Sequence, residues 1–148
     1  MASRTTMSRY RHGAHPIAGW FGIIFFSLAA GLIGTLLHRS GADRGIPWGL
    51  ALALLLLFAT AWWSRRAHGL LGLAICLLLS TGLIWLVGSN YGPGGDILVP
   101  IASKAFTTFW SKNAGYTWIV GATIVQLIVM FFPAHLFEVP ATPAHVAD

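Results

Sequence analysis

Four stretches of this chain are apolar, lack charged side chains and are long, and they restrict its fold more than any other feature. They cover residues 17–37, 47–64, 69–88 and 116–132. At about 1.5 Å per residue, an α-helix over the first stretch is roughly 31 Å long. That length matches the hydrocarbon core of a bilayer. We therefore predict an all-α, integral membrane four-helix bundle, which occupies residues 17–133 as one domain.

The composition agrees with a membrane protein. Of the 148 residues, 56% are hydrophobic and only 9% are charged, whereas soluble domains average about 25% charged residues. The formal net charge is +5, but the basic residues lie in short segments beside the apolar stretches, as topology signals do. We therefore expect the lipid bilayer, and not nucleic acid, as a partner. The single cysteine, Cys76, can form no internal disulfide.

The polar segments predict the orientation. Residues 1–16 form a basic arm and residues 134–148 a tail that we expect to be irregular. With four spans, Arg4, Arg9, Arg11, Arg65 and Arg66 lie on one side of the membrane. Arg39, Arg44, Lys104 and Lys112 lie on the other side. Basic residues close to the ends of spans favour the cytoplasm. We therefore predict a multi-pass plasma-membrane protein with both termini cytoplasmic.

A cleaved signal peptide is an alternative interpretation of the basic start and the first apolar stretch. Residues 17–37 are longer than the apolar region of about 7–15 residues that signal peptides usually have. Residues 28–31 are similar to a lipoprotein cleavage site, but the cysteine needed for lipid attachment is missing. We therefore favour a first membrane span.

Glycine and proline are concentrated in residues 90–100, between the third and fourth stretches. Such residues end helices and form turns, which predicts a loop at the outer mouth of the bundle. Its carboxylate, Asp96, is the best candidate for a functional side chain, because Arg39, Arg44 or Lys104 lies on the same side. The alternative, which we favour, is a carboxylate that caps a turn. The neighbouring loop candidates are Gly92, Pro93, Gly94 and Gly95.

Residues 101–113 follow this loop and combine aromatic and basic side chains. Phe106, Phe109 and Trp110 share one helical face. This pattern predicts a short interfacial helix on the outer membrane surface, before the fourth span. Docking on a partner protein is an equally compatible explanation.

Polar residues are few inside the apolar stretches. Pumps, proton relays and most secondary transporters keep an ionisable group in the membrane, and none of the four stretches contains Asp, Glu, Lys or Arg. Gln126, with Thr123 nearby, is the most polar residue there. A glutamine in a span usually bonds to a neighbouring helix. The alternative is that it lines a substrate or quinone pocket.

Small residues recur on the first stretch at a spacing of four. Gly22 follows Ala18, and Gly34 follows Ala30, in this way. Such spacing lets two helices approach closely. The partner helix belongs either to this chain, which we favour, or to another subunit.

The six histidines do not form a metal-type cluster in the sequence. His12 and His15 lie three apart, and the others are scattered. A bis-histidine haem needs histidines at matching depth on two helices, and the best pair, His68 and His135, lies at predicted helix ends. We therefore assign no catalytic residue, no cofactor and no metal ligand.

Three short patches resemble one family. They are Pro47-Trp48-Gly49-Leu50, Gly92-Pro93-Gly94-Gly95-Asp96-Ile97-Leu98-Val99-Pro100 and Gly115-Tyr116-Thr117-Trp118. Together they are similar to small actinobacterial four-helix membrane proteins of unassigned function, found beside or fused behind the deacetylase of mycothiol synthesis. The chain departs from that pattern by a longer insert at 101–114 and by having no deacetylase portion. The resemblance implies an actinobacterial plasma membrane and supplies no catalytic residue.

These observations lead to two functional hypotheses. The first is a non-catalytic accessory or structural subunit of a larger membrane-protein complex, with an actinobacterial respiratory assembly as one possible host. The alternative is a small carrier or channel for a neutral or lipid-like solute, with Gln126, Thr123 and Asp96 along its route. We favour the first hypothesis because the spans carry no charge and have small-residue faces.

Overall fold

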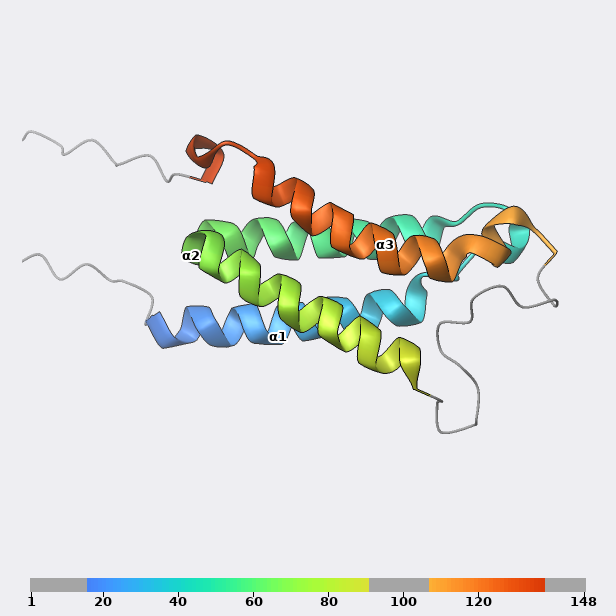
Figure 1. Cartoon of the computed structure of the whole chain (residues 1–148), viewed down its shortest axis with the longest axis horizontal. Helices are drawn as coiled ribbons and strands as arrows, with labels where there is room; N and C mark the ends of the chain where they lie inside the picture. Colours follow the sequence, from blue (N-terminus) through green and yellow to red (C-terminus); the bar gives the residue numbers. More distant parts are fainter. Residues whose placement is uncertain (1–15, 91–106, 138–148) are drawn as a thin grey trace, which may run out of the picture.

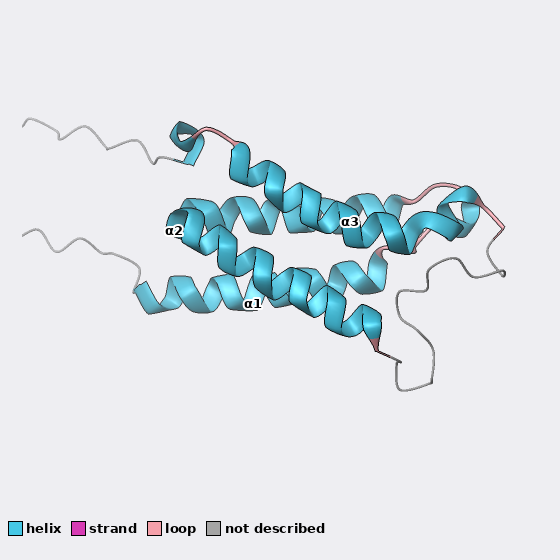
Figure 2. Cartoon of the chain, in the orientation of Figure 1, coloured by secondary structure: helices cyan, strands magenta, loops and turns pink. Residues whose placement is uncertain are grey.

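The computed structural model describes residues 16–90 and 107–137, and in these residues the regular structure is entirely helical (Figure 2). In chain order the elements are α1 (Pro16–Leu37), η1 (Ala42–Arg44), α2 (Trp48–Ser89), α3 (Phe109–Phe131) and η2 (Ala134–Phe137), where η marks a short 3₁₀ helix. The helices α1, α2 and α3 are long and apolar enough to cross a membrane. The predicted all-α fold is confirmed, but the described residues contain three long helices and not four.

The helix α2 reverses its direction at His68 and Gly69 (Figure 1). His68 has φ −135° and ψ 22°, and Gly69 has φ 63° and ψ −150°. Glycine adopts the second conformation readily because it has no Cβ. Residues 48–67 and 70–89 therefore form two antiparallel arms, here called the first arm and the second arm. The two arms lie close together, because a Cβ added at Gly72 would collide with the backbone oxygen of Ser64. In a straight helix these two residues would be about 12 Å apart along the axis, so their contact requires the reversal.

The reversal lies where the sequence predicts a turn, but it takes fewer residues. We expected the turn to include Arg65 and Arg66, with a helix ending near Ser64. Both arginines instead belong to the last helical turn of the first arm. This difference matters because a position on a helix fixes the direction in which each arginine points.

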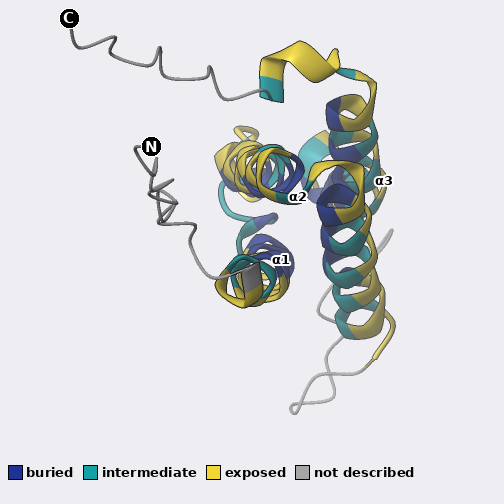
Figure 3. Ribbon diagram, turned by 90° about the vertical axis from the view of Figure 1, so that its left-hand side faces the viewer, coloured by how far each residue is buried: buried dark blue, intermediate teal, exposed yellow. Residues whose placement is uncertain are grey.

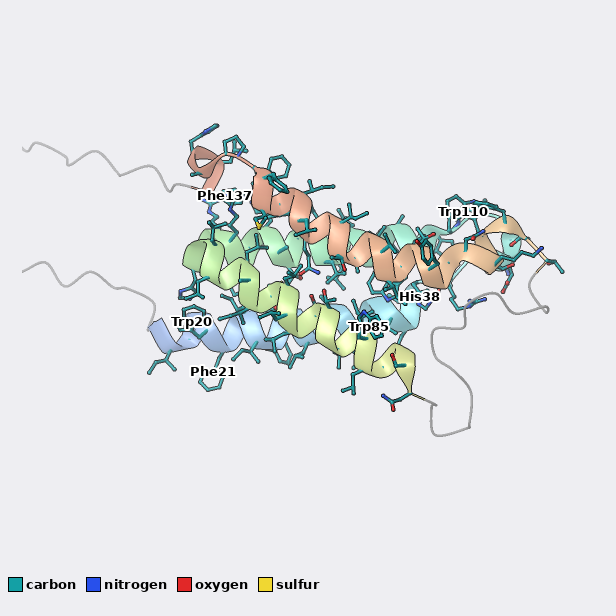
Figure 4. The ribbon with its side chains drawn as sticks, in the orientation of Figure 1. Trp20, Phe21, His38, Trp85, Trp110 and Phe137 are labelled. Atoms are coloured by element: carbon teal, nitrogen blue, oxygen red, sulfur yellow. The ribbon has the colours of Figure 1, made fainter. Side chains whose placement is uncertain are left out.

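The bundle has two distinct ends (Figure 1). The terminal end contains residues 16–20, 65–70 and 131–137, and the loop end contains residues 38–47, 89–90 and 107–111. Figure 4 shows Trp20 and Phe137 at the terminal end, and His38 and Trp110 at the loop end.

The tail was expected to be irregular from residue 134 onward, but residues 134–137 form the 3₁₀ helix η2.

The helix α3 begins at Phe109, seven residues before the predicted start at Tyr116. A capping box explains the early start. The side chain of Thr108 accepts a hydrogen bond from the Ser111 N–H at 3.1 Å, and the Ser111 hydroxyl accepts one from the Thr108 N–H at 3.1 Å. These two bonds satisfy N–H groups that lack partners at a helix start.

The predicted interfacial helix is therefore wrong for residues 109–113, which form the first turns of α3. The remaining residues of that prediction up to Phe106 lie outside the described residues. Phe109 is exposed, whereas Trp110 is half-buried against the core. The two aromatic side chains thus have different surroundings, although they were predicted to share one face.

Small residues let α1 lie close to the rest of the bundle. A Cβ added at Gly22 would lie 2.7 Å from the ring of Trp63 on the first arm, and one at Gly34 would overlap the ring of Trp118 on α3. Neither ring leaves room for a larger residue. Gly22 and Gly34 therefore pack against helices of this chain, whereas Ala18, the other small residue of the first pair, is exposed.

Buried residues lie on the sides of α1, α2 and α3 that face one another (Figure 3). One core cluster consists of Ala30, Leu50, Ala53, Leu57, Ile84, Trp118 and Ala122. A second consists of Ile23, Ala61, Leu73, Cys76 and Val129. The outward surfaces are also apolar, with Phe21 69% exposed and Leu78 70% exposed. An apolar exterior around a packed interior is typical of helices that meet lipid.

Gly34→Ala is expected to lower the free energy of unfolding by about 1–3 kcal/mol, the range for overpacked sites. The added methyl group would collide with the ring of buried Trp118. Gly82→Ala is the matched control, because nothing lies within 4 Å of a Cβ at that helical position. The measurement is unfolding in mixed micelles, followed by tryptophan fluorescence. Equal losses for the two variants would contradict the proposed packing.

Candidate functional site

Asp96 and its neighbours Gly92, Pro93, Gly94 and Gly95 lie outside the described residues. Their roles stay predictions. The polar groups among the described residues lie within the helical bundle and at its two ends.

A polar cluster lies in the interior of the bundle, centred on the amide of Gln126. Its Oε1 accepts a hydrogen bond from the Ser80 hydroxyl at 3.0 Å, and its Nε2 donates to the Ala122 carbonyl at 3.0 Å. The Cys76 sulfur lies 3.7 Å from the same Oε1 atom. Gln126 is on α3 and Ser80 on the second arm, so the amide joins two helical segments. This contact is the interhelical bond that we expected of a glutamine in a span.

Two further hydroxyl groups approach this cluster from the other segments. Ser27 on α1 and Ser64 on the first arm are both fully buried, and both lie close to the Cys76 thiol. Neither hydroxyl oxygen has a hydrogen-bond partner of good geometry among residues 16–90 and 107–137. Neither serine stands out in the sequence, because single serines in apolar helices are common and usually bond to their own backbone.

A lateral pocket of about 240 Å³ opens beside this cluster, between the second arm and α3. Its lining is almost wholly apolar and consists of Leu70, Leu73, Ala74, Leu77, Gln126, Leu127 and Met130. The Thr123 hydroxyl instead donates to the Ile119 carbonyl at 3.4 Å. Of the two predicted route residues in the span, only Gln126 lines this pocket.

A second polar group joins α1 to α3 at the loop end. The Trp118 indole N–H donates to the Thr35 hydroxyl at 3.2 Å, and that hydroxyl donates to the Gly31 carbonyl at 2.7 Å. The buried ring of His38 lies parallel to Trp118, with Nδ1 2.6 Å from the Thr35 carbonyl. Burial lowers the pKa of His38 below its ordinary value of 6.5, and the neighbouring Arg39 charge lowers it further. The neutral ring is therefore favoured here.

A third polar group lies at the terminal end around Arg65, which is only 8% exposed. Its guanidinium donates hydrogen bonds to the backbone carbonyls of Val129 and Phe132, the second at 2.8 Å. The same group lies 4.2 Å from the centre of the Phe137 ring. Carbonyls at the end of a helix lack partners within it and carry partial negative charge. Arg65 thus satisfies the last turn of α3 and fixes η2 against the first arm.

The histidines are distributed over both ends. His68 stacks on Trp20 with ring centroids 4.1 Å apart, His135 is exposed on η2, and His38 lies at the opposite end. Within the described ranges, no group of three or more His, Cys, Asp or Glu side chains could hold a metal ion.

Comparisons with known proteins return no match. No family model, no curated protein and no solved structure is similar enough to the chain to be matched.

Arg65→Gln is expected to lower the free energy of unfolding by about 2–3 kcal/mol, because hydrogen bonds from charged donors contribute about 1.5–3 kcal/mol. Arg66→Gln is the matched control. Arg66 is adjacent and exposed, so its loss is expected to change stability by less than about 0.5 kcal/mol. Unfolding in mixed micelles measures both. A similar effect of the two changes would contradict the assigned role of Arg65.

Proposed function

We propose that the chain is an integral membrane protein that crosses the plasma membrane four times and serves as a non-catalytic accessory subunit of a larger complex. The observation that carries this proposal is the distribution of polar groups in the bundle. Gln126, Ser80 and Trp118 bond to partners inside the bundle, while large apolar side chains cover its exterior. Such a unit is suited to packing against lipid and against other apolar helices.

The reversal of α2 supports four crossings. As a straight helix its 42 residues would be about 63 Å long, twice the thickness of a bilayer core. Each arm alone is about 30 Å long. With α1 and α3, the two arms make four segments of spanning length, and the turn at His68 and Gly69 lies between the second and third crossings.

The distribution of arginines supports cytoplasmic termini. Arg65 and Arg66 lie at the terminal end, where α1 begins and α3 ends (Figure 1). The sequence before Pro16 adds Arg4, Arg9 and Arg11. Basic residues close to spans are enriched on the cytoplasmic side.

The exterior of α1 also supports an accessory role. Its exposed side chains include Ile17, Phe21, Phe25 and Leu36, each more than half exposed. A face of this kind can meet lipid or a helix of another subunit. The resemblance of three sequence patches to an actinobacterial family favours the actinobacterial plasma membrane, with a respiratory assembly as one candidate host.

Single-cysteine labelling tests the topology. In a Cys76→Ala background, Asp43→Cys at the loop end is expected to react with a membrane-impermeant maleimide on intact cells. Ala67→Cys at the terminal end is expected to react only after permeabilisation. Both positions are exposed. Reaction of both positions from outside would contradict a double crossing by α2, and the reversed pattern would contradict cytoplasmic termini.

Native mass measurement after mild-detergent extraction tests the accessory role. The tagged chain is expected to elute with larger membrane proteins in fixed stoichiometry. An unrelated four-span protein with the same tag and expression level is the control. A lone monomer or homodimer that carries a neutral solute into liposomes would contradict the proposal.

That outcome would support a small carrier as the second candidate function. The lateral pocket of about 240 Å³ beside Gln126 favours this alternative. It offers one amide in an apolar lining, which suits a neutral or lipid-like solute.

A further inference from the structure

A second pocket, of about 300 Å³, lies at the terminal end of the bundle. It is formed where the first arm ends, the second arm begins and η2 passes over both. Its lining consists of Arg65, Arg66, Gly69, Leu70, Ala134 and Phe137. Two adjacent cations and two large apolar side chains therefore share one cavity.

Contacts hold one of the two cations, Arg65, in a fixed position, while Arg66 is exposed. Arg65 is held by the backbone carbonyls of Val129 and Phe132 and by the ring of Phe137. These partners are uncharged, so they position the guanidinium without neutralising it. In residues 16–90 and 107–137 the only carboxylate is Asp43, which lies on η1 at the loop end (Figure 1).

The backbone adds to this charge. The left-handed conformation of Gly69 ends the first arm and starts the second arm at Leu70. The start of a helix carries partial positive charge from its aligned peptide groups. Gly69 and Leu70 line the same pocket as the two arginines, so the start of the second arm lies beside them. A negative group in this pocket would thus interact with Arg66, Arg65 and the helix start together.

We infer that this pocket binds the phosphate of an anionic phospholipid. Arg65 and Arg66 supply the charge for the phosphate, and Leu70 and Phe137 supply an apolar surface for the glycerol and the first acyl carbons. The pocket lies at the end of the apolar helices, which is the depth of the headgroups if the bundle spans the bilayer as proposed. Basic pockets between spans on the cytoplasmic side are suited to anionic headgroups.

Native mass spectrometry of the purified full chain tests this inference. The protein is released from nanodiscs that contain equal amounts of phosphatidylglycerol and phosphatidylcholine, and the retained lipids are counted. The wild type is expected to retain phosphatidylglycerol preferentially. Arg66→Gln is expected to lower that preference about fivefold, the value for one basic residue at a lipid surface. Arg44→Gln, an exposed arginine at the loop end, is the matched control and is expected to retain the wild-type preference.

Each other outcome would overturn the inference. Equal retention of the two lipids by the wild type would exclude a specific site, and equal losses in the two variants would indicate diffuse attraction between charges. Binding of inorganic phosphate in phosphatidylcholine nanodiscs, lost in Arg66→Gln, would assign the pocket to a free anion. Failure of the membrane proposal is distinguishable, because the chain would then be absent from the membrane fraction before any lipid is added.

Discussion

The reversal of α2 at His68 and Gly69 determines where the other segments lie. A glycine with φ 63° turns what would be a rod of about 63 Å into a hairpin of spanning length. It brings Ser64 against Gly72 and gives α1 and α3 two arms to pack on. The same turn places Arg65 and Arg66 beside the first residues of the second arm. The charged pocket at the terminal end is therefore a direct consequence of how the chain reverses.

Packing and polar contacts have different roles within this hairpin. In an apolar solvent, burying apolar side chains gives little driving force for association, so close packing of small residues becomes important. Gly22 and Gly34 supply that packing by accommodating two indole rings. Polar contacts such as the one between Ser80 and Gln126 contribute about 0.6–2 kcal/mol each. They fix how the helices are positioned relative to one another, because each hydrogen-bond donor must lie close to its acceptor.

The sequence predicts most of the helical architecture but not the details that form the sites. Uncharged stretches of spanning length are sufficient to predict α1 and the region of the turn at His68. The start of α3 was missed because Ser111, in place of the usual acid or amide, completes the capping box of Thr108. The role of Arg65 was also missed. Its acceptors are backbone carbonyls 64 and 67 residues away. Every residue has a backbone carbonyl, so no pattern of side chains in the sequence indicates which carbonyls an arginine will contact.

The hairpin of α2 can be tested most directly by the distance between spin labels at Trp48 and Ser89, both exposed ends of that helix. The measurement uses double electron–electron resonance on Trp48→Cys/Ser89→Cys in a Cys76→Ala background, in lipid nanodiscs. The reversal at Gly69 predicts a distance below about 35 Å, because both labels then lie at the loop end. A distance near 62 Å, which an unbroken helix of this length requires at about 1.5 Å per residue, would contradict the hairpin and the four crossings built on it.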